Sequence, residues 1–119
     1  MSLRVLIVDD HESFRRLAAR MLAEAGFAVV GEAVDAASAL RAVARLAPDV
    51  VLLDIVLPDR SGLAVAAQLA AAPAAPRVIL TSSRSRSDFG QSFAWPAGCR
   101  FVPKHELSGA GLTALLQQP

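Results

Sequence analysis

Polar residues able to do chemistry stand at the ends of four short apolar runs. They are Asp9 and Asp10 after residues 4–8, Asp54 after 50–53, Thr81 after 77–80, and Lys104 shortly after 99–102. Three carboxylates brought together repel one another and raise one another's pKa values, which favours a bound divalent cation. Mg²⁺ takes one or two protein carboxylates, keeps several waters and shares a phosphate oxygen. With an ammonium and a hydroxyl added, the set suits a phosphoryl group, and a carboxylate is available as nucleophile.

The apolar patterning predicts that these side chains meet at one edge of a sheet. Short β-rich runs over 4–8, 27–31, 50–53, 77–80 and 99–102 alternate with helical patterns. Short β-α-β crossovers imply a parallel sheet with helices on both faces. The first, third and fourth runs are apolar throughout, as strands covered on both faces are, whereas the second is expected nearer an edge. In such a sheet, ligands bind beyond the carboxyl ends of the strands.

Capping residues predict where the helices begin and end. A first helix carries Phe14 and ends at Gly26, and a second begins after Asp35. A third begins at Ser61 or Gly62. A last helix is predicted from about Glu106, with Leu112, Leu115 and Leu116 facing inward.

The segment 85–98 is predicted to be the least regular part of the fold. Gly90 costs about 1 kcal/mol relative to alanine inside a helix, and Pro96 must end one. We expect a short helix over 87–94, held by Phe89, Phe93 and Trp95 and mobile in the unphosphorylated chain.

Composition narrows the class of protein. The 119 residues are 54% hydrophobic and 19% charged, which suits one folded domain and excludes disorder. The net charge is +1 and no basic run stands out, so a dedicated nucleic-acid surface has no support. Cys99 is the only cysteine, which excludes an internal disulfide and a cysteine zinc cage. No apolar run reaches membrane-span length and no signal peptide is present, so a soluble cytoplasmic setting is expected.

Four motifs in chain order carry a family resemblance. They are Val-Leu-Ile-Val-Asp9-Asp10-His, Leu-Leu-Asp54-Ile-Val-Leu-Pro58-Asp-Arg-Ser-Gly62, Val-Ile-Leu-Thr81-Ser and Phe101-Val-Pro-Lys104. With them, residues 1–119 resemble a single receiver domain of a bacterial two-component response regulator. The resemblance implies a flavodoxin-like (βα)5 sandwich with a parallel five-stranded sheet in the order 2-1-3-4-5. The stretches 30–33 and 103–107 are most similar to the subfamily with a C-terminal LuxR-type helix-turn-helix.

The resemblance also implies a role for each residue of the motifs. Asp54 would accept the phosphoryl group from a sensor histidine kinase. Mg²⁺ would be held by Asp10 directly, by Asp9 largely through water, by Asp54, and by the backbone carbonyl of Val56. Thr81 and Lys104 would bind the phosphoryl group, and Phe101 would be an aromatic switch residue. Pro58 and Gly62 would shape the loop after Asp54.

The expected output follows from the same resemblance. Phosphorylation would change the surface formed by the fourth helical segment, the last strand and the last helix, and this surface would also support a homodimer. DNA would be bound only through a C-terminal domain that this chain lacks, and a membrane is not a partner. The domain would be no enzyme, beyond assisting its own phosphorylation and dephosphorylation.

Three other interpretations remain open at this point. The unusual segment 85–98 is compatible with a degenerate receiver that binds partners without phosphorylation. An aspartyl phosphatase would need an acid two positions after the nucleophile, where Val56 stands. An FMN carrier would need a phosphate loop after the first strand, where the acidic residues 9–12 would repel a phosphate without metal. His11 and His105 are interpreted as surface or packing residues, and His105 stands where many relatives of this family have proline.

Overall fold

The computed structural model describes residues 2–84, 95–96 and 98–117. Its strands are β1 (Arg4–Val8), β2 (Ala28–Ala33), β3 (Val50–Asp54), β4 (Arg77–Ser82) and β5 (Cys99–Pro103). Its helices are α1 (Glu12–Glu24), α2 (Ala36–Leu46), α3 (Gly62–Ala70), the short 3-10 helix η2 (Lys104–Glu106) and α4 (Gly109–Leu116). Strands and helices therefore alternate as the patterning predicts from β1 to β4 and again after β5, and most of the segment between β4 and β5 lies outside the described residues.

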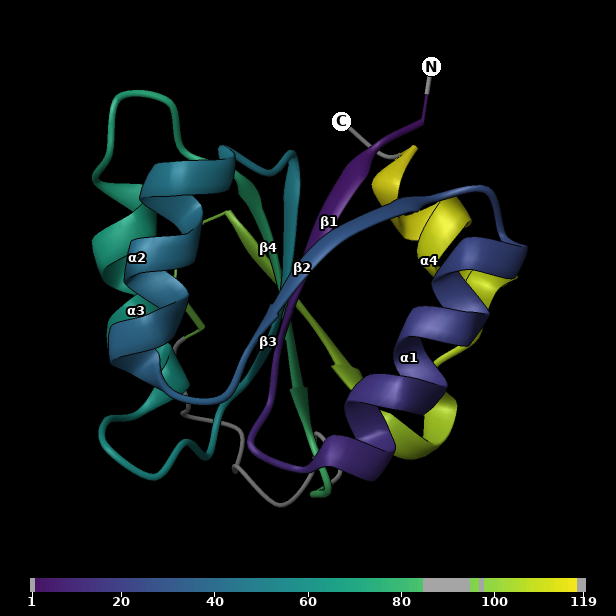
Figure 1. Cartoon of the computed structure of the whole chain (residues 1–119), viewed down its shortest axis with the longest axis horizontal. Coiled ribbons are helices and arrows are strands. Elements are labelled where there is room, and N and C mark those ends of the chain that lie inside the picture. The colour runs from purple at the N-terminus through teal and green to yellow at the C-terminus, as the bar shows by residue number, and fades with distance from the viewer. Residues whose placement is uncertain (1, 85–94, 97, 118–119) are drawn as a thin grey trace.

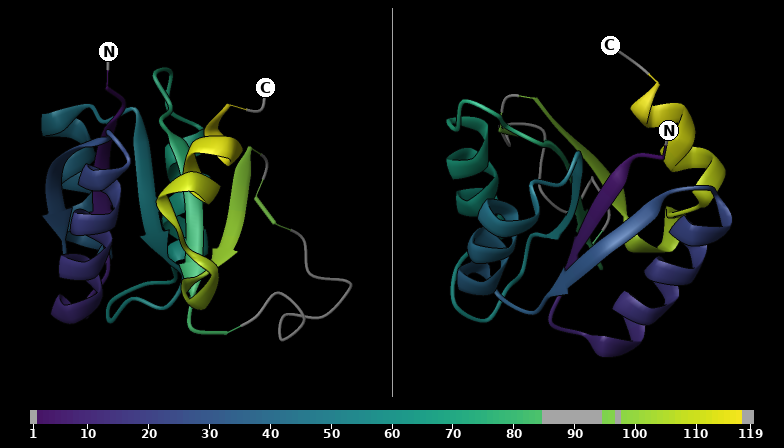
Figure 2. Two further views of the ribbon diagram at one scale, coloured as in Figure 1. Left: turned by 90° about the vertical axis from the view of Figure 1, so that its right-hand side faces the viewer. Right: turned by 45° about the horizontal axis from the view of Figure 1, so that its top comes forward.

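Among the described residues, the strands form a parallel sheet in the order β2-β1-β3-β4-β5. This order confirms the predicted flavodoxin-like arrangement, and β2 lies at an edge as expected. Helices α2 and α3 cover one face, and α1 and α4 cover the other (Figures 1 and 2). Because all strands run the same way, their carboxyl ends lie along a single edge, the lower one in Figure 1.

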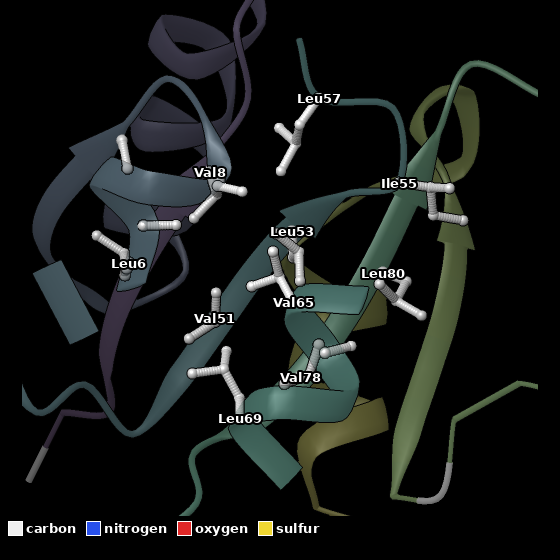
Figure 3. Packing of buried hydrophobic residues seen from close by; sticks show 14 of the residues in the cluster. Leu6, Val8, Val51, Leu53, Ile55, Leu57, Val65, Leu69, Val78 and Leu80 are labelled. Carbon is white, nitrogen blue, oxygen red and sulfur yellow. The ribbon is translucent and has the colours of Figure 1, made fainter. Parts of the chain in front are cut away.

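Each face of the sheet buries its own hydrophobic cluster. On the α2 and α3 side, Val65 and Leu69 of α3 pack with Val51, Leu53, Val78 and Leu80 of the strands (Figure 3). On the other side, Leu22 of α1 and Leu112 of α4 pack over Ile7 and Leu52. Side chains of β1, β3 and β4 are buried on both faces, which explains why these runs are apolar throughout.

Local side-chain hydrogen bonds set the helix starts. Asp35 accepts from the backbone N–H of Ser38, whose hydroxyl reaches back to the N–H of Asp35, so the predicted cap of α2 is confirmed. The Ser61 hydroxyl accepts from the N–H of Leu63 and caps α3. Gly26 after α1 has a φ of 95°, which glycine adopts without steric cost.

The predicted start of the last helix is wrong by about one turn. Residues Lys104–Glu106 form the separate 3-10 turn η2, and α4 begins at Gly109 instead of near Glu106. The reason is Ser108, whose hydroxyl accepts the N–H of Gly111 and caps α4. Leu112 is buried as predicted, and Leu115 and Leu116 pack against the same cluster.

Two further sequence predictions concern the segment 85–98 and membrane spans. The short helix predicted over 87–94 lies outside the described residues. Within the ranges that the structure describes, no helix is long and apolar enough to cross a membrane.

Candidate phosphoryl and metal site

The polar residues singled out in the sequence gather at the carboxyl edge of the sheet. Asp9 directly follows β1, Asp54 ends β3, and Lys104 directly follows β5. Thr81 lies in β4 in register with Asp54, so their side chains project from the same face of the sheet. Four strands thus bring together residues that lie far apart in the sequence.

Lys104 is the centre of the charge arrangement. Its Nζ lies 2.6 Å from Oδ2 of Asp9 and 3.2 Å from Oδ2 of Asp54. The same ammonium lies 4.5 Å from the centre of the Phe14 ring, which α1 places beneath it. The Lys104 side chain is 14% exposed, and those of Asp9 and Asp54 are 0% and 4% exposed. One cation therefore neutralises part of the charge of two buried carboxyl groups.

The two carboxyl groups differ in proton affinity. Burial, together with the charge of Asp9, raises the pKa of Asp54 to about 6, although the N–H of Val56 and the Lys104 ammonium oppose the rise. Burial would also raise the pKa of Asp9, but the Lys104 ammonium and the His11 N–H hold it below its ordinary value. Asp9 is therefore the ionised partner of Lys104, whereas at Asp54 the opposing hydrogen bonds and the ammonium do not offset the effect of burial.

This difference predicts how the stability of the domain changes with pH. The folded state holds the proton of Asp54 more tightly than the unfolded chain, whose pKa is 3.8. The resulting stabilisation is present below pH 3.8 and lost as the pH rises through about 6. Asp54→Asn should therefore raise the free energy of unfolding by about 2 kcal/mol at pH 7.5 in chelator, and by little at pH 4. Urea unfolding at both pH values tests this, and an equal gain at both would contradict it.

The donor set fits a divalent cation. Asp9, Asp10, His11 and Asp54 offer one ligand atom each, and these atoms lie within 4.8 Å of one another. Beside them, the buried Thr81 hydroxyl has no hydrogen-bond partner among the described residues. Asp10 is the exposed acid of the set, with a side chain that is 36% exposed. Oxygen ligands of this kind are those that Mg²⁺ takes, and the hydroxyl remains available to a bound group.

The loop after β3 is held tightly against Asp54. The N–H of Gly62 donates to the carbonyl of Ile55 over 2.7 Å, and Val56 forms a β-bridge with Ser61. A Cβ on Gly62 would lie 2.1 Å from the carbonyl oxygen of Asp54, so only glycine fits there. Pro58 lies in an exposed bend of the same loop. The expectation that Gly62 shapes this loop thus has a steric basis.

The predicted switch residue Phe101 points into the core. It is 5% exposed and stacks on Trp95, with ring centres 4.6 Å apart and an interplanar angle of 25°. Trp95 also packs against the cluster on the α2 and α3 face, in agreement with its interpretation as a packing residue. Phe101 therefore lies inward in this structure, and β4 separates its strand from the strand that ends in Asp54.

Several residues that support the site were not predicted from the sequence. Arg15 donates to the carbonyl of Asp9 over 2.8 Å and pairs with Glu32, which anchors the turn after β1. Asp59 accepts from the N–H groups of Ala36 and Ala37 and so ties the loop after β3 to the start of α2. The helical pattern placed Phe14 in the core, and nothing in the pattern indicated the cation above it. His11 also lies at the site, and its position directly after Asp10 was the one feature of the sequence that could have indicated this.

The comparisons with known proteins agree with the fold. The family model described as response regulator receiver domain matches residues 5–114, and the chain belongs to this family. Proteins of this family act in two-component signalling, receive signals from histidine kinases and bind Mg²⁺ at an acidic pocket.

Individual relatives support the assignment. The signal receiver domain of the putative response regulator NarL from Mycobacterium tuberculosis is 32% identical, with a TM-score of 0.80 over 98% of both chains. A LuxR-family response regulator from Aurantimonas is 27% identical, with a TM-score of 0.82 over 98% of this chain and 84% of that chain. A putative transcriptional regulator of Pseudomonas aeruginosa is 38% identical over 87% of this chain and 50% of its own length.

Other relatives carry different names. A protein-glutamate methylesterase/protein-glutamine glutaminase of Myxococcus xanthus is 48% identical over 68% of this chain, but over only 24% of its own length. This chain thus spans about a quarter of the length of the methylesterase relative and half of the length of the transcriptional regulator.

Proposed function

We propose that this chain is a phosphoacceptor switch domain that takes a phosphoryl group from a sensor histidine kinase onto Asp54. The observation that carries the proposal is the ammonium of Lys104, which lies within 3.2 Å of Asp54 and 2.6 Å of Asp9. An ammonium held between two carboxyl groups and a buried hydroxyl without a partner among the described residues can both donate to the oxygens of a phosphoryl group on Asp54. We regard residues 1–119 as one receiver domain, in a cytoplasmic protein.

The chemistry of each side chain follows from its surroundings. An oxygen of Asp54 attacks the phosphorus of the phosphorylated kinase histidine, the P–N bond breaks, and the histidine leaves. With a pKa of about 6, Asp54 is mostly ionised at neutral pH and so retains the lone pair that the attack requires. Lys104 and Thr81 then donate to the oxygens of the transferred group. The Thr81 hydroxyl gives up no hydrogen bond to another described residue when it does so.

The acidic residues would hold Mg²⁺ during this transfer. Asp10 and Asp54 are proposed as direct ligands with the backbone carbonyl of Val56, and Asp9 as a ligand largely through water. Asp9 suits the indirect role because it is fully buried and already paired with Lys104, whereas Asp10 is partly exposed. When bound, the ion neutralises the charge that develops on the phosphoryl oxygens.

The output is proposed to use the surface around β5 and α4. Lys104 directly follows β5 and begins η2, which connects that strand to α4. A shift of its ammonium toward a phosphoryl group would therefore move both elements. Phe101 on β5 is the proposed aromatic switch. The LuxR-family and transcriptional-regulator relatives support an output through a C-terminal DNA-binding domain. The same surface is proposed to form a homodimer.

Phosphorylation of Asp54 is directly testable with a small acyl phosphate. In Mg²⁺, wild-type protein should gain one phosphoryl group by intact-mass analysis, and Asp54→Asn should gain none. Asp49→Asn is a suitable control, because Asp49 lies at the opposite end of β3 and binds the backbone of Arg4. Equal labelling of wild type and Asp54→Asn would reject the proposal and favour a receiver that acts without phosphorylation.

Metal titration distinguishes the two acids after β1. If Asp10 is the direct ligand, Asp10→Asn should weaken Mg²⁺ binding by about tenfold or more, and Asp9→Asn should weaken it less. Calorimetry on both variants gives the two affinities. A larger loss in the Asp9 variant would reverse the assignment.

A further inference from the structure

His11 is part of the acidic cluster instead of an isolated surface histidine. Its Nδ1 lies 3.1 Å from Oδ1 of Asp9 and 3.2 Å from Oδ1 of Asp10. Together with Asp54, these three residues place their ligand atoms within 4.8 Å of one another. An imidazole nitrogen therefore stands in the same donor set as three carboxylates.

A packing role does not explain this position. The His11 side chain is 65% exposed, so it contributes little to a core. It precedes α1 at the N-cap position, yet its side chain makes no capping hydrogen bond. The ring instead turns its Nδ1 toward the carboxylates, where Nδ1–H donates to Oδ1 of Asp9. In the other tautomer of the ring, the lone pair of Nδ1 can meet a cation at the same place.

The surrounding turn is held in place from both sides. The N–H of Asp9 donates to the carbonyl of Ala33, and the N–H of His11 donates to Oδ1 of Asp9 over 2.8 Å. Arg15 fixes the carbonyl of Asp9 from α1. The buried hydroxyl of Thr81, in register with Asp54, has no partner among the described residues and so is available to a further bound group. Little rearrangement of the backbone is therefore needed for His11 to act as a ligand.

The chemistry of the ring selects among metals. Mg²⁺ is a hard ion that takes oxygen ligands and rarely uses imidazole. Imidazole suits Co²⁺, Ni²⁺ and Zn²⁺, whose affinities for mixed nitrogen and oxygen sites exceed those of harder ions. We propose that His11 is a metal ligand that gives this site a second binding mode, for first-row transition ions, and that Mg²⁺ does not use it. The inference rests on the proposed metal site formed by the carboxylates.

Replacement of His11 separates the two modes. His11→Gln in the full chain should weaken Co²⁺ and Ni²⁺ binding by about tenfold or more and change Mg²⁺ binding by less than about twofold. His105→Gln is the matched control: it removes the other histidine of the chain, which lies 3.5 Å from Glu106 and outside the cluster. It should leave all three affinities unchanged.

A spectroscopic readout shows ligation without relying on affinity. Because the chain has two histidines, ligation should give the His11 ring protons large contact shifts in Co²⁺, beyond the through-space shifts that proximity alone produces, and those of His105 only small shifts. Normal Mg²⁺ binding with equal Co²⁺ and Ni²⁺ affinities in wild type and His11→Gln would overturn this inference alone. Failure of wild type to bind Mg²⁺, Co²⁺ or Ni²⁺ would overturn the proposed metal site together with it.

Discussion

Gly62→Ala should destabilise the domain by about 3 kcal/mol or more, the largest loss expected from a single methyl group in this chain. The new Cβ would lie 2.1 Å from the carbonyl oxygen of Asp54 and 2.9 Å from Cα of Ile55. Both are backbone atoms, so no side chain can rotate away to make room. Relief requires the start of α3 to move away from β3, which would also break the hydrogen bond from Gly62 to Ile55.

A second glycine provides the control for this prediction. Gly26 has a φ of 95°, but a Cβ there would meet nothing within 4 Å. Gly26→Ala should therefore cost only the strain of a left-handed alanine, about 1 kcal/mol. Urea unfolding of both variants measures the two losses. Equal losses would mean that the loop after β3 adapts freely, and would contradict the role given to Gly62 beside Asp54.

Lys104→Ala should accept a phosphoryl group yet fail to transmit its presence. In the resting structure the ammonium is shared between Asp9 and Asp54. Phosphorylation would offer it a stronger charge-assisted contact, and this differential contact is what shifts the conformational equilibrium. Without the ammonium, phosphorylation makes no new contact that would shift β5 and α4. Lys104→Arg should also respond poorly, because a larger planar guanidinium replaces a point charge that fits between two carboxyl groups and the Phe14 ring.

Amide hydrogen exchange of β5, η2 and α4 measures the response, with and without beryllofluoride as a phosphoryl mimic. Wild type should show a change in protection over these elements, and both Lys104 variants should show little. Arg100→Ala is the matched control, since Arg100 is an exposed cation on the same strand and none of the ion pairs of the cluster within the described residues involves it. A wild-type response in Lys104→Arg would refute the point-charge explanation.

The fold was predictable because local patterns and the sheet topology agree. Three continuous apolar runs became the central strands, and Asp35 and Ser61 capped helices where their positions indicated. The start of the last helix was not predicted. Glu106 continues an acceptable helical pattern, and the choice of Ser108 as cap depends on how tightly the chain turns after β5 at Lys104.

The membership of the site was predictable, but its internal contacts were not. Residues at the ends of parallel strands must meet, so Asp9, Asp54 and Lys104 could be brought together from sequence alone. Which carboxyl group pairs more closely with the ammonium depends on distances of a few tenths of an ångström. The orientations of His11 and Phe14 depend on the packing angle of α1, which apolar periodicity does not specify.

Chemical mapping of the phosphorylated position tests the central claim most directly. Wild-type protein would be treated with an acyl phosphate and Mg²⁺, and then reduced with borohydride, which converts an aspartyl phosphate into homoserine. Peptide sequencing by mass spectrometry locates that residue. Homoserine at position 54 alone, and only when Mg²⁺ is present during phosphorylation, is the predicted result. Homoserine at position 9 or 10, or a phosphoryl group on His11 or His105, would contradict the assignment of Asp54 as the phosphoacceptor.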